Sequence, residues 1–484
     1  MPVQSRQSYN SLLYAHRNLM PDNSDSAKSP PDQVAACRLA APSSSLLLYQ
    51  LAFSVLNIFP LCNPFLCFFT TFFLFLCKFC ATATKLFSLT SLPSNSMMNY
   101  HVKIQKGINI KMDYLQKLTL HRRELHKIPE LSGSLPKTKA YIKSVLEALD
   151  CQVFDVLESG IYAYFDRGKE RTTAYRADMD ALPVKEINTH DYVSTHEGNM
   201  HACGHDGHSA MVLTLAEYVN QQRELPCNVL CIFQPAEETT GGAKDICNTG
   251  ILEKYRVDRI YGVHLWPFME AGKIASKPGP MMPRSSEITI EVTGRSSHAT
   301  APENGIDALF IACRYVQEIY DSHKARMRPN PAPEQRTIIQ ICKMVSGTAR
   351  NVISGHSFLL GTVRAFSDED FAGLVKILEE TADRLSREYN CQITARHTEG
   401  YPPVVNDVQL YDRILPALKE NLDYEEMEIP AMISEDYSFY GLHVPSVFFF
   451  LGTGTGISLH SNNFDFDETV LMHGLELYET LLFQ

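Results

Sequence analysis

The apolar and polar positions after residue 111 alternate between helical and strand periodicities. Residues 137–149 place a set of apolar side chains on one helical face: Tyr141, Ile142, Val145, Leu146 and Leu149. Four short apolar runs have the length of strands, namely GIYAYF, TTAYRA, CNVLCIF and DRIYGVHL, and helix-like segments such as residues 207–221 separate them. Because strands that alternate with helices build a sheet covered by helices, this pattern predicts an α/β domain.

Residues 286–399 follow a different order. SEITIEVTG alternates Ile288, Ile290 and Val292 as a half-buried strand does. A helical pattern over 305–327, the strand patterns RTIIQICKMV and GHSFLLGTVRAF, an amphipathic helix over 368–389 and the strand CQITARH follow. The order β-α-β-β-α-β is that of a ferredoxin-like unit, which is complete in itself. We therefore predict an inserted second domain, after which the chain returns to the first near residue 400, with a helix over 408–422, the strand SVFFFLG and a closing helix from 467.

These patterns divide the chain into four parts: an N-terminal extension (1–111), the first part of the α/β domain (112–285), the inserted domain (286–399) and the second part of the α/β domain (400–484). The length of 484 residues also favours more than one domain.

The N-terminal extension contains an unusually apolar stretch. No charged residue occurs from Leu39 to Cys77, yet the run reaches the roughly 20 residues of a membrane helix only by including Pro60, Asn63 and Pro64. Three interpretations compete: a membrane anchor within residues 46–80, a targeting segment, or extra sequence upstream of the true start. We favour the third, because Met112 opens periodic helical sequence.

The composition indicates which partners and which cellular compartment the protein is expected to have. The net charge of −11 disfavours nucleic acid, since phosphate binding needs concentrated lysine and arginine. Five of the thirteen cysteines lie in the extension, and the others are scattered, often in apolar runs, as Cys231 and Cys313 are. This distribution predicts buried free thiols in a reducing compartment rather than a disulfide framework, and hence a cytoplasmic protein.

The densest group of candidate ligands is NMHACGHDGH, residues 199–208. Cys203 and His205 lie one residue apart on a glycine-containing loop just before a helix. A thiolate and an imidazole are good ligands for zinc, manganese, cobalt or nickel. The alternative interpretation is a histidine-rich loop that only caps a helix.

Further polar side chains follow predicted strands in the same way: Asp178 and Asp180 in RADMD, Glu237 and Glu238 in FQPAEE, His264 in DRIYGVHL and His460 in ISLHSNN. Taken singly, adjacent glutamates are usually solvated and a lone histidine is usually structural. Because an open α/β sheet binds ligands beyond the carboxyl ends of its strands, we expect these groups to meet at one edge as a metal site.

The motifs LHKIPEL, YRADMDALPV, GNMHACGHDGHSAM, FQPAEE, GVHLWP, GTARNVI, GTVRAF, SEDYSFY and LHSNNFDFDE resemble, in this order, those of a family of metal-dependent amidohydrolases. This aminoacylase/carboxypeptidase family includes hippurate hydrolase, auxin-conjugate hydrolases and N-acetyldiaminopimelate deacetylase. The resemblance covers essentially all of residues 112–484. It implies a two-metal, aminopeptidase-like catalytic domain with an inserted dimerisation or lid domain, and a homodimer formed through that domain.

The resemblance also implies roles for individual residues. The ligands of two divalent ions (manganese, zinc, cobalt or nickel) would be Cys203, His205, Glu238, His264 and His460, with Cys203 bridging. Glu237 would be the catalytic base, Asp180 its support, His298 a group that reaches substrate across a dimer, and Asn351 a substrate contact. The alternative interpretation is that His298 is a surface histidine without a role in the reaction. Ser296 and Ser297 before His298, and Glu303 after Pro302, depart from the lid motif of the family but leave the metal ligands untouched.

The expected reaction is hydrolysis of small N-acyl amino acids, with an acetyl, benzoyl or indole-acetyl group, to a carboxylate and a free amino acid. One alternative is a dipeptidase or carboxypeptidase of the same fold. Those relatives commonly carry His-x-Asp where this chain has Asp178-Met179-Asp180, and an acidic ligand in place of His205. Another alternative is a catalytically silent, membrane-tethered binding protein, which would be expected to lack at least one of these groups.

Overall fold

The computed structural model describes residues 111–239 and 241–484, and it begins with a helix over residues 111–126. The predicted apolar segment at residues 46–80 lies outside this part of the chain. Within the described part, no helix has the length and apolarity that crossing a membrane requires.

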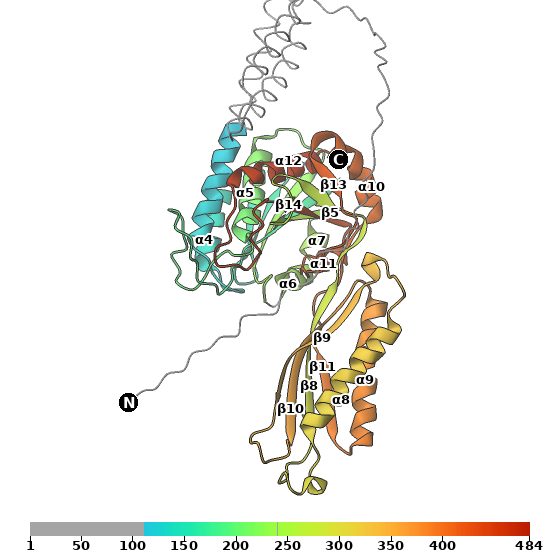
Figure 1. The fold of residues 1–484 in the computed structure, drawn as a ribbon. Helices are drawn as coiled ribbons and strands as arrows, with labels where there is room; N and C mark the ends of the chain where they lie inside the picture. The colour runs from blue at the N-terminus through green and yellow to red at the C-terminus, as the bar shows by residue number, and fades with distance from the viewer. Residues whose placement is uncertain (1–110, 240) are drawn as a thin grey trace, which may run out of the picture. The chain divides into compact units, whose positions relative to one another are not determined.

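The catalytic domain is built on an eight-stranded sheet with the order β1-β2-β4-β3-β5-β14-β6-β13. Figure 1 shows β5, β13 and β14 of this sheet. Its strands are β1 (Gln152–Val156), β2 (Gly160–Phe165), β3 (Thr172–Asp178), β4 (Asn228–Gln234), β5 (Val257–Trp266), β6 (Ile274–Ser276), β13 (Tyr424–Glu426) and β14 (Ser446–Gly452). The central strands β4, β3, β5 and β14 run parallel to one another, so their carboxyl ends share one edge of the sheet.

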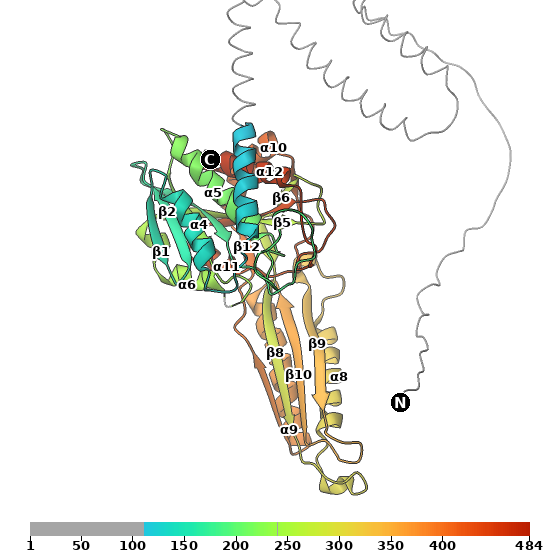
Figure 2. The same ribbon diagram turned by 90° about the vertical axis from the view of Figure 1, so that its left-hand side faces the viewer.

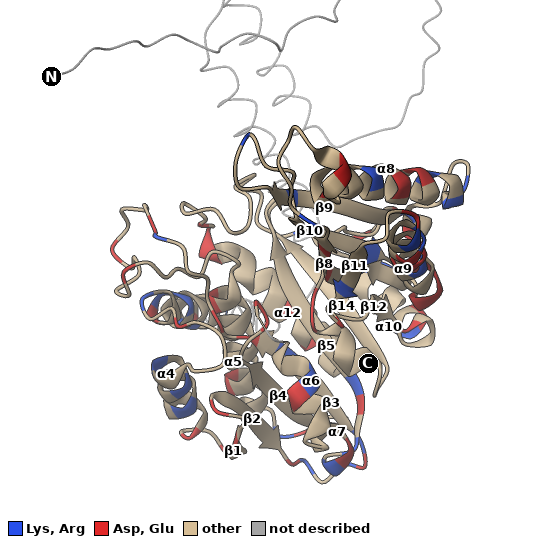
Figure 3. Ribbon diagram, turned by 90° about the horizontal axis from the view of Figure 1, so that it is seen from below, with Lys and Arg blue, Asp and Glu red and all other residues tan. Residues whose placement is uncertain are grey.

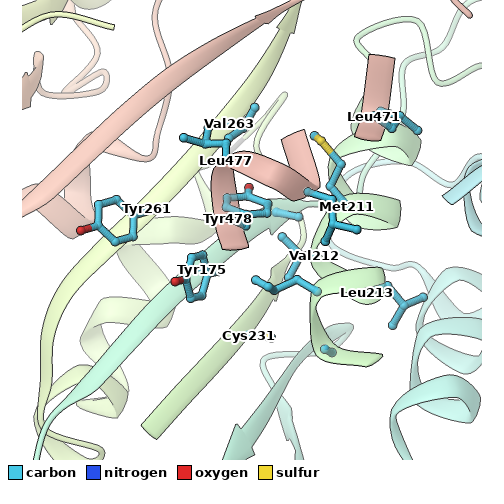
Figure 4. Close-up of a cluster of buried hydrophobic side chains, with 14 of the residues drawn as sticks. Tyr175, Met211, Val212, Leu213, Cys231, Tyr261, Val263, Leu471, Leu477 and Tyr478 are labelled. Carbon is cyan, nitrogen blue, oxygen red and sulfur yellow. The ribbon is translucent and has the colours of Figure 1, made fainter. Parts of the chain in front are cut away.

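Two hydrophobic clusters, one on each face, hold helices against this sheet. One cluster joins the sheet to α4 (Pro136–Leu146), α5 (His205–Gln221), α10 (Val408–Asn421) and α12 (Leu471–Leu482), and the other joins it to α6 (Gly242–Asn248), α7 (Ile251–Lys254) and α11 (Ser438–Gly441). Along β3 and β4 the side chains alternate between the clusters: Tyr175 and Cys231 face the first, Ala174 and Leu230 the second. Figure 4 shows Tyr175 and Cys231 beside side chains of α5 and α12.

The inserted domain is an antiparallel sheet with the order β11-β8-β10-β9. The chain order is β8 (Arg284–Thr293), α8 (Ala308–Arg326), β9 (Thr337–Ser346), β10 (His356–Ala365), α9 (Asp368–Glu388) and β11 (Gln392–His397), which confirms the ferredoxin-like unit. Both helices cover the same face of the sheet (Figures 1 and 2). The predicted alternation in the first strand is confirmed, because Ile288, Ile290 and Val292 are all buried in the core beneath the helices.

Short elements join and close the domains. The strands β7 (Gly279–Met282) and β12 (Val404–Asn406) pair where the chain leaves and re-enters the catalytic domain. Three short 3₁₀ helices complete the described elements: η1 (Pro302–Asn304), η2 (Pro333–Gln335) and η3 (Glu468–Val470). The predicted closing helix from residue 467 is therefore a 3₁₀ turn capped by Asp467, followed by α12.

Predicted boundaries differ from the observed ones where capping decides them. The helix predicted over 305–327 begins at Ala308, because the side chain of Asp307 accepts hydrogen bonds from the backbone N–H groups of Leu309 and Phe310.

The prediction that Cys313 is buried was wrong. Its neighbour Ala312 lies on the buried stripe of α8, whereas Cys313 is one residue further round the helix and exposed.

The eight cysteines of the described residues are all free, and Cys231 is buried as predicted. Figure 3 shows that both basic and acidic residues occur along α8 and α9.

Candidate metal centre

A cavity of about 430 Å³ opens at the carboxyl ends of the parallel strands. The following residues line it: Cys203, Glu237, Glu238, His264, Arg364, Tyr401, Met432, Ile433, Ser434, Glu435, Leu459 and His460. Four of the five predicted metal ligands are therefore in its wall. The fifth, His205, lies beside them, with its Nε2 atom 3.9 Å from Oε1 of Glu238.

Local turns bring these side chains together. Gly204, with φ of 88°, adopts the left-handed conformation at the start of α5, and a Cβ atom there would meet the Leu265 side chain at 2.9 Å. Glycine therefore allows the sharp turn between Cys203 and His205. On the other side of the cavity, the backbone N–H of His460 donates to the carbonyl oxygen of Ala202 at 2.8 Å, which holds the loop after β14 against Cys203.

The ligand atoms are close enough to share cations. Sγ of Cys203 lies 3.4 Å from Nε2 of His264, and Nε2 of His460 lies 3.4 Å from Oε1 of Glu238. Two overlapping triads, Cys203–His205–His264 and Cys203–Glu238–His460, each have their ligand atoms within 4.8 Å of one another. Both triads contain Cys203.

The hydrogen-bonded partners of the histidines leave the opposite ring nitrogens available. Nδ1–H of His205 donates to the carbonyl oxygen of Asp180 at 2.8 Å, and Nδ1–H of His264 donates to that of Leu265 at 2.7 Å. Nε2 of His205 and Oε1 of Glu238 are buried and have no hydrogen-bond partner. Buried polar atoms without partners are costly, so a donor set of thiol, imidazole and carboxylate with such atoms fits a bound divalent cation.

Asp180 fixes the pair of glutamates. Its Oδ1 accepts a hydrogen bond from the backbone N–H of Glu237 at 3.0 Å, and its Oδ2 accepts one from that of Glu238 at 3.1 Å. Since its carbonyl oxygen also holds His205, Asp180 touches the predicted base and two predicted ligands without lining the cavity.

Burial and neighbouring carboxylates set the electrostatics of the cavity. Burial, then the charges of Glu435 and Asp436, raise the pKa of Glu237 well above its usual range, which suits a group that accepts a proton. Burial and the nearby glutamates also raise the pKa of the Cys203 thiol. Burial lowers the pKa of His264 to about 3, so its ring is neutral, as a metal-ligating imidazole must be.

A buried ion network beneath the cavity was not predicted. Nη1 of Arg176 donates to Asp178 at 2.7 Å, and its Nη2 donates to Asp436 at 2.7 Å and lies 3.0 Å from Glu435. Burial raises the pKa of Glu435 to about 8 despite this guanidinium. The only signal in the sequence was that these residues belong to the motifs YRADMD and SEDYSFY, because their contacts join segments 260 residues apart.

Asp178 is held in a second way. Nδ1–H of His208 donates to its Oδ1 at 2.7 Å, and Nε2 of His208 accepts the backbone N–H of Leu265 at 2.9 Å. Oδ2 of Asp178 lies 3.7 Å from Nε2 of His205. Asp178 is thus engaged by Arg176 and His208 and faces the predicted ligand.

Two further lining residues were also missed. Arg364, near the end of β10, is partly buried, and its Nη1 has no hydrogen-bond partner. Burial lowers the pKa of its guanidinium, since no anion offsets the desolvation. The hydroxyl of Tyr401 donates to the backbone oxygen of Glu237 at 2.8 Å. Arg364 belongs to the motif GTVRAF, but nothing in the sequence shows that its side chain reaches the cavity, and Tyr401 lies outside the quoted motifs.

His298 and Asn351 lie on the inserted domain, away from the cavity wall. Both are exposed, and they are neighbours, since His298 forms a β-bridge with Val352. Nδ1 of His298 is hydrogen-bonded to the hydroxyl of Thr300 at 2.7 Å. They lie beyond the Thr293–His356 end of the β8–β10 pair, whereas Arg364 is at its other end, about 30 Å away at the usual rise of a strand.

The comparison with known families agrees with this architecture. The profile of Peptidase family M20/M25/M40 matches residues 174–484, more than half of the chain. The chain belongs to Peptidase family M20/M25/M40, which confirms the resemblance to metal-dependent amidohydrolases.

The matches between this chain and similar proteins span nearly the whole length of those proteins. A Staphylococcus epidermidis protein described as an uncharacterized hydrolase is 35% identical over 384 residues, 77% of this chain and 98% of the relative. A Staphylococcus aureus structure assigned to the aminohydrolases has a TM-score of 0.73 at 30% identity, covering 78% of this chain and 100% of that one. The Bacillus subtilis YXEP protein, described as a dinuclear metal binding peptidase, has a TM-score of 0.67 at 28% identity, covering 77% and 98%.

Proposed function

We propose that this chain is a two-metal amidohydrolase that cleaves N-acyl amino acids. The observation that carries the proposal is the cavity itself, where four side chains able to bind metal, with His205 beside them, meet a buried glutamate and an unpartnered arginine. The dinuclear metal site named for the YXEP protein supports the number of ions. The ligands would be Cys203, His205, Glu238, His264 and His460, with Cys203 shared between the two triads.

When bound, divalent ions such as zinc, manganese, cobalt or nickel supply an acidified water and an electrophile that polarises the scissile carbonyl. The carboxylate of Glu237 takes the proton of the attacking water and delivers it to the leaving amine nitrogen. The C–N bond breaks, and the products are a carboxylic acid and an amino acid. Asp180 keeps Glu237 in place through the backbone N–H bond.

Arg364 supports a substrate that carries a carboxylate. An unpaired, partly buried guanidinium in the same cavity as the predicted metal ligands is suited to pair with an anion, and an N-acyl amino acid presents its α-carboxylate next to the scissile amide. The guanidinium then orients the substrate while the acyl carbonyl faces the ligand cluster.

His298 and Asn351 complete the proposal only through a second copy of the chain. With the inserted sheet separating them from the cavity wall of their own chain, they would reach substrate in the cavity of a partner subunit. The strand β9 lies at one edge of the inserted sheet and exposes Met344 and Val345, so it offers a surface for a homodimer. The free thiols support a reducing, cytoplasmic location.

The direct test is amino-acid release by the full chain from N-acetyl, N-benzoyl and N-indole-acetyl amino acids, each with manganese, zinc, cobalt or chelator. The matched substrates are the same compounds with the carboxylate converted to an amide, together with a set of dipeptides. We expect ion-dependent release from the free acids. A folded protein that hydrolyses dipeptides but no N-acyl amino acid with any ion would contradict the proposal and favour a dipeptidase.

Arg364→Met tests the substrate class directly. We expect kcat/KM for the N-acyl amino acids to fall roughly 10- to 100-fold, the effect of losing a hydrogen bond to a charged group, while the amide substrates are unaffected. Arg396→Met, in β11 and 61% exposed, is the control and leaves both unchanged. Equal losses on free acids and amides would show that Arg364 does not bind the carboxylate.

A further inference from the structure

A second cluster of metal-binding side chains lies outside the cavity. It consists of His126 at the end of the first helix, with Glu186 and His190 from the loop between β3 and α5. Their ligand atoms lie within 4.8 Å of one another, and none of the three residues lines the catalytic cavity. We propose that His126, Glu186 and His190 bind a structural zinc ion, independently of the ions proposed for the cavity.

The spacing of the ligand atoms fits a zinc tetrahedron. Nε2 of His126 lies 3.2 Å from Oε1 of Glu186, and Nε2 of His190 lies 3.4 Å from the same oxygen. Metal–ligand bonds of about 2.0–2.1 Å in tetrahedral geometry separate two ligand atoms by about 3.3 Å. Two of the three ligand pairs therefore have the separation of a tetrahedral site, and the two histidine nitrogens lie within 4.8 Å of each other.

The partner of His126 is the kind that supports a metal ligand. Nδ1 of His126 is 2.7 Å from Oδ2 of Asp206, and Arg122 donates to the same carboxylate oxygen at 3.0 Å. A histidine whose far nitrogen donates to a carboxylate turns the lone pair of its other nitrogen toward the metal. In the neutral ring this lone pair faces the Glu186 oxygen, so two acceptors meet unless a cation lies between them.

The surroundings of His190 distinguish a metal site from a simple ion pair between His126 and Glu186. A doubly protonated His126 would satisfy Glu186 without any metal. It would leave His190 unexplained, because both ring nitrogens of His190 are buried without a hydrogen-bond partner while its ring stacks on Tyr192 with centroids 3.7 Å apart. A cation between the two rings gives a partner to Nε2 of His190 and to Nε2 of His126 together.

The surroundings supply the rest of a coordination sphere. Oδ2 of Asp465 lies 3.7 Å from Nε2 of His190 and is the nearest candidate for a fourth ligand, the alternative being water. Glu186 is held for its role by the backbone N–H of Ser194, which donates to Oε2 at 2.7 Å, and by the Asn188 amide, which donates to Oε1 at 3.1 Å. A bound ion would tie this loop to the first helix.

The test is the zinc content of the full chain, stripped with chelator, reloaded and separated from free metal. We expect His190→Gln to hold one zinc ion fewer per chain than the unsubstituted protein. The matched control is His443→Gln, because His443 also faces one carboxylate, that of Glu253 at 3.6 Å, but has no third ligand. We expect this control to hold as much zinc as the unsubstituted protein.

A second measurement needs no variant: anomalous scattering at the zinc edge from crystals of the unsubstituted chain soaked in zinc. A peak between Nε2 of His126 and Nε2 of His190 supports the proposal whatever the cavity holds. Zinc-saturated crystals without a peak there overturn it, as does an unchanged zinc content in folded His190→Gln. If His190→Gln does not fold, the scattering measurement decides alone. Neither readout uses hydrolysis, so failure of the proposed function would leave this test intact.

Discussion

The two domains differ most in what they bury. In residues 286–399, all of which the structure describes, the buried polar side chains are only serines and a threonine: Ser286, Ser354, Ser357 and Thr381. The catalytic domain buries ten charged side chains: Arg122, Arg176, Asp178, Asp180, Asp206, Glu237, Arg259, Glu435, Asp436 and Glu468. Burying an unpaired charge is costly, so these groups are retained where they are paired or are needed for chemistry.

The inserted domain can therefore contribute a side chain to the cavity without burying charged groups in its own core. The inserted domain has an apolar core of ordinary alternating strands, and its contribution to the cavity is Arg364, near the end of one strand. The catalytic domain instead gathers charge at the carboxyl edge of its parallel strands, where each strand end adds one or two polar groups.

The largest expected effect comes from removing the predicted base. We expect Glu237→Gln to lower kcat roughly 10²- to 10⁴-fold, the usual range for a general acid–base group, while the content of bound metal stays the same. The measurement pairs kcat on the best substrate with metal analysis. Glu197→Gln, 89% exposed in the same domain, is the control. A variant at Glu237 that kept more than a tenth of the kcat would exclude it as the base.

The next effect tests the buried charges of the catalytic domain. Arg176→Met leaves Asp178, Glu435 and Asp436 without their cation, so we expect the free energy of unfolding to fall by roughly 3–5 kcal/mol. Arg171→Met, just before β3 and 71% exposed, is expected to change it by less than about 1 kcal/mol. Urea unfolding followed by circular dichroism measures both. Equal stabilities for the two variants would show that the network adds nothing.

The smallest effect is expected in the inserted domain. Ile290→Val removes one buried methylene-sized group from an apolar core and should cost roughly 0.5–1.5 kcal/mol of unfolding free energy. Ile290 pairs with Leu359, whereas Arg364, the lining residue that the inserted domain supplies, pairs with Ser285 near the other end of β10, so we expect kcat of the folded variant to be unchanged. A loss of kcat beyond tenfold with this small loss of stability would mean that packing in the inserted domain sets the geometry of the cavity.

Much of the fold was predictable because its signals are local. The strands β2, β3, β4, β5 and β14 are apolar runs of strand length, and the alternation of Ile288, Ile290 and Val292 marks a one-sided strand. Cys313 was predicted wrongly because membership of an apolar run does not say on which face of the helix a residue lies. An apolar helical segment also has an exposed face, and Cys313 lies on it.

The part of the candidate site that follows predicted strands or lies in recognisable motifs could be predicted from the sequence. Cys203, Glu238, His264 and His460 come from four separate segments, and the parallel sheet brings them to one cavity as expected. The roles of these residues, and those of Glu237, Asp180, His298 and Asn351, remain predictions. Arg364 and Arg176 lie in the motifs GTVRAF and YRADMDALPV, but their roles could not be found in this way, because these roles depend on partners that are distant in sequence and on burial in the folded protein.

Asp180 aligns three side chains of the site with one another. One carboxylate receives the backbone N–H groups of both Glu237 and Glu238, and the carbonyl of the same residue receives His205. A small displacement of Asp180 would therefore move the predicted base and two predicted metal ligands together. We expect this shared anchor to keep the three side chains aligned with one another when the edge of the sheet moves.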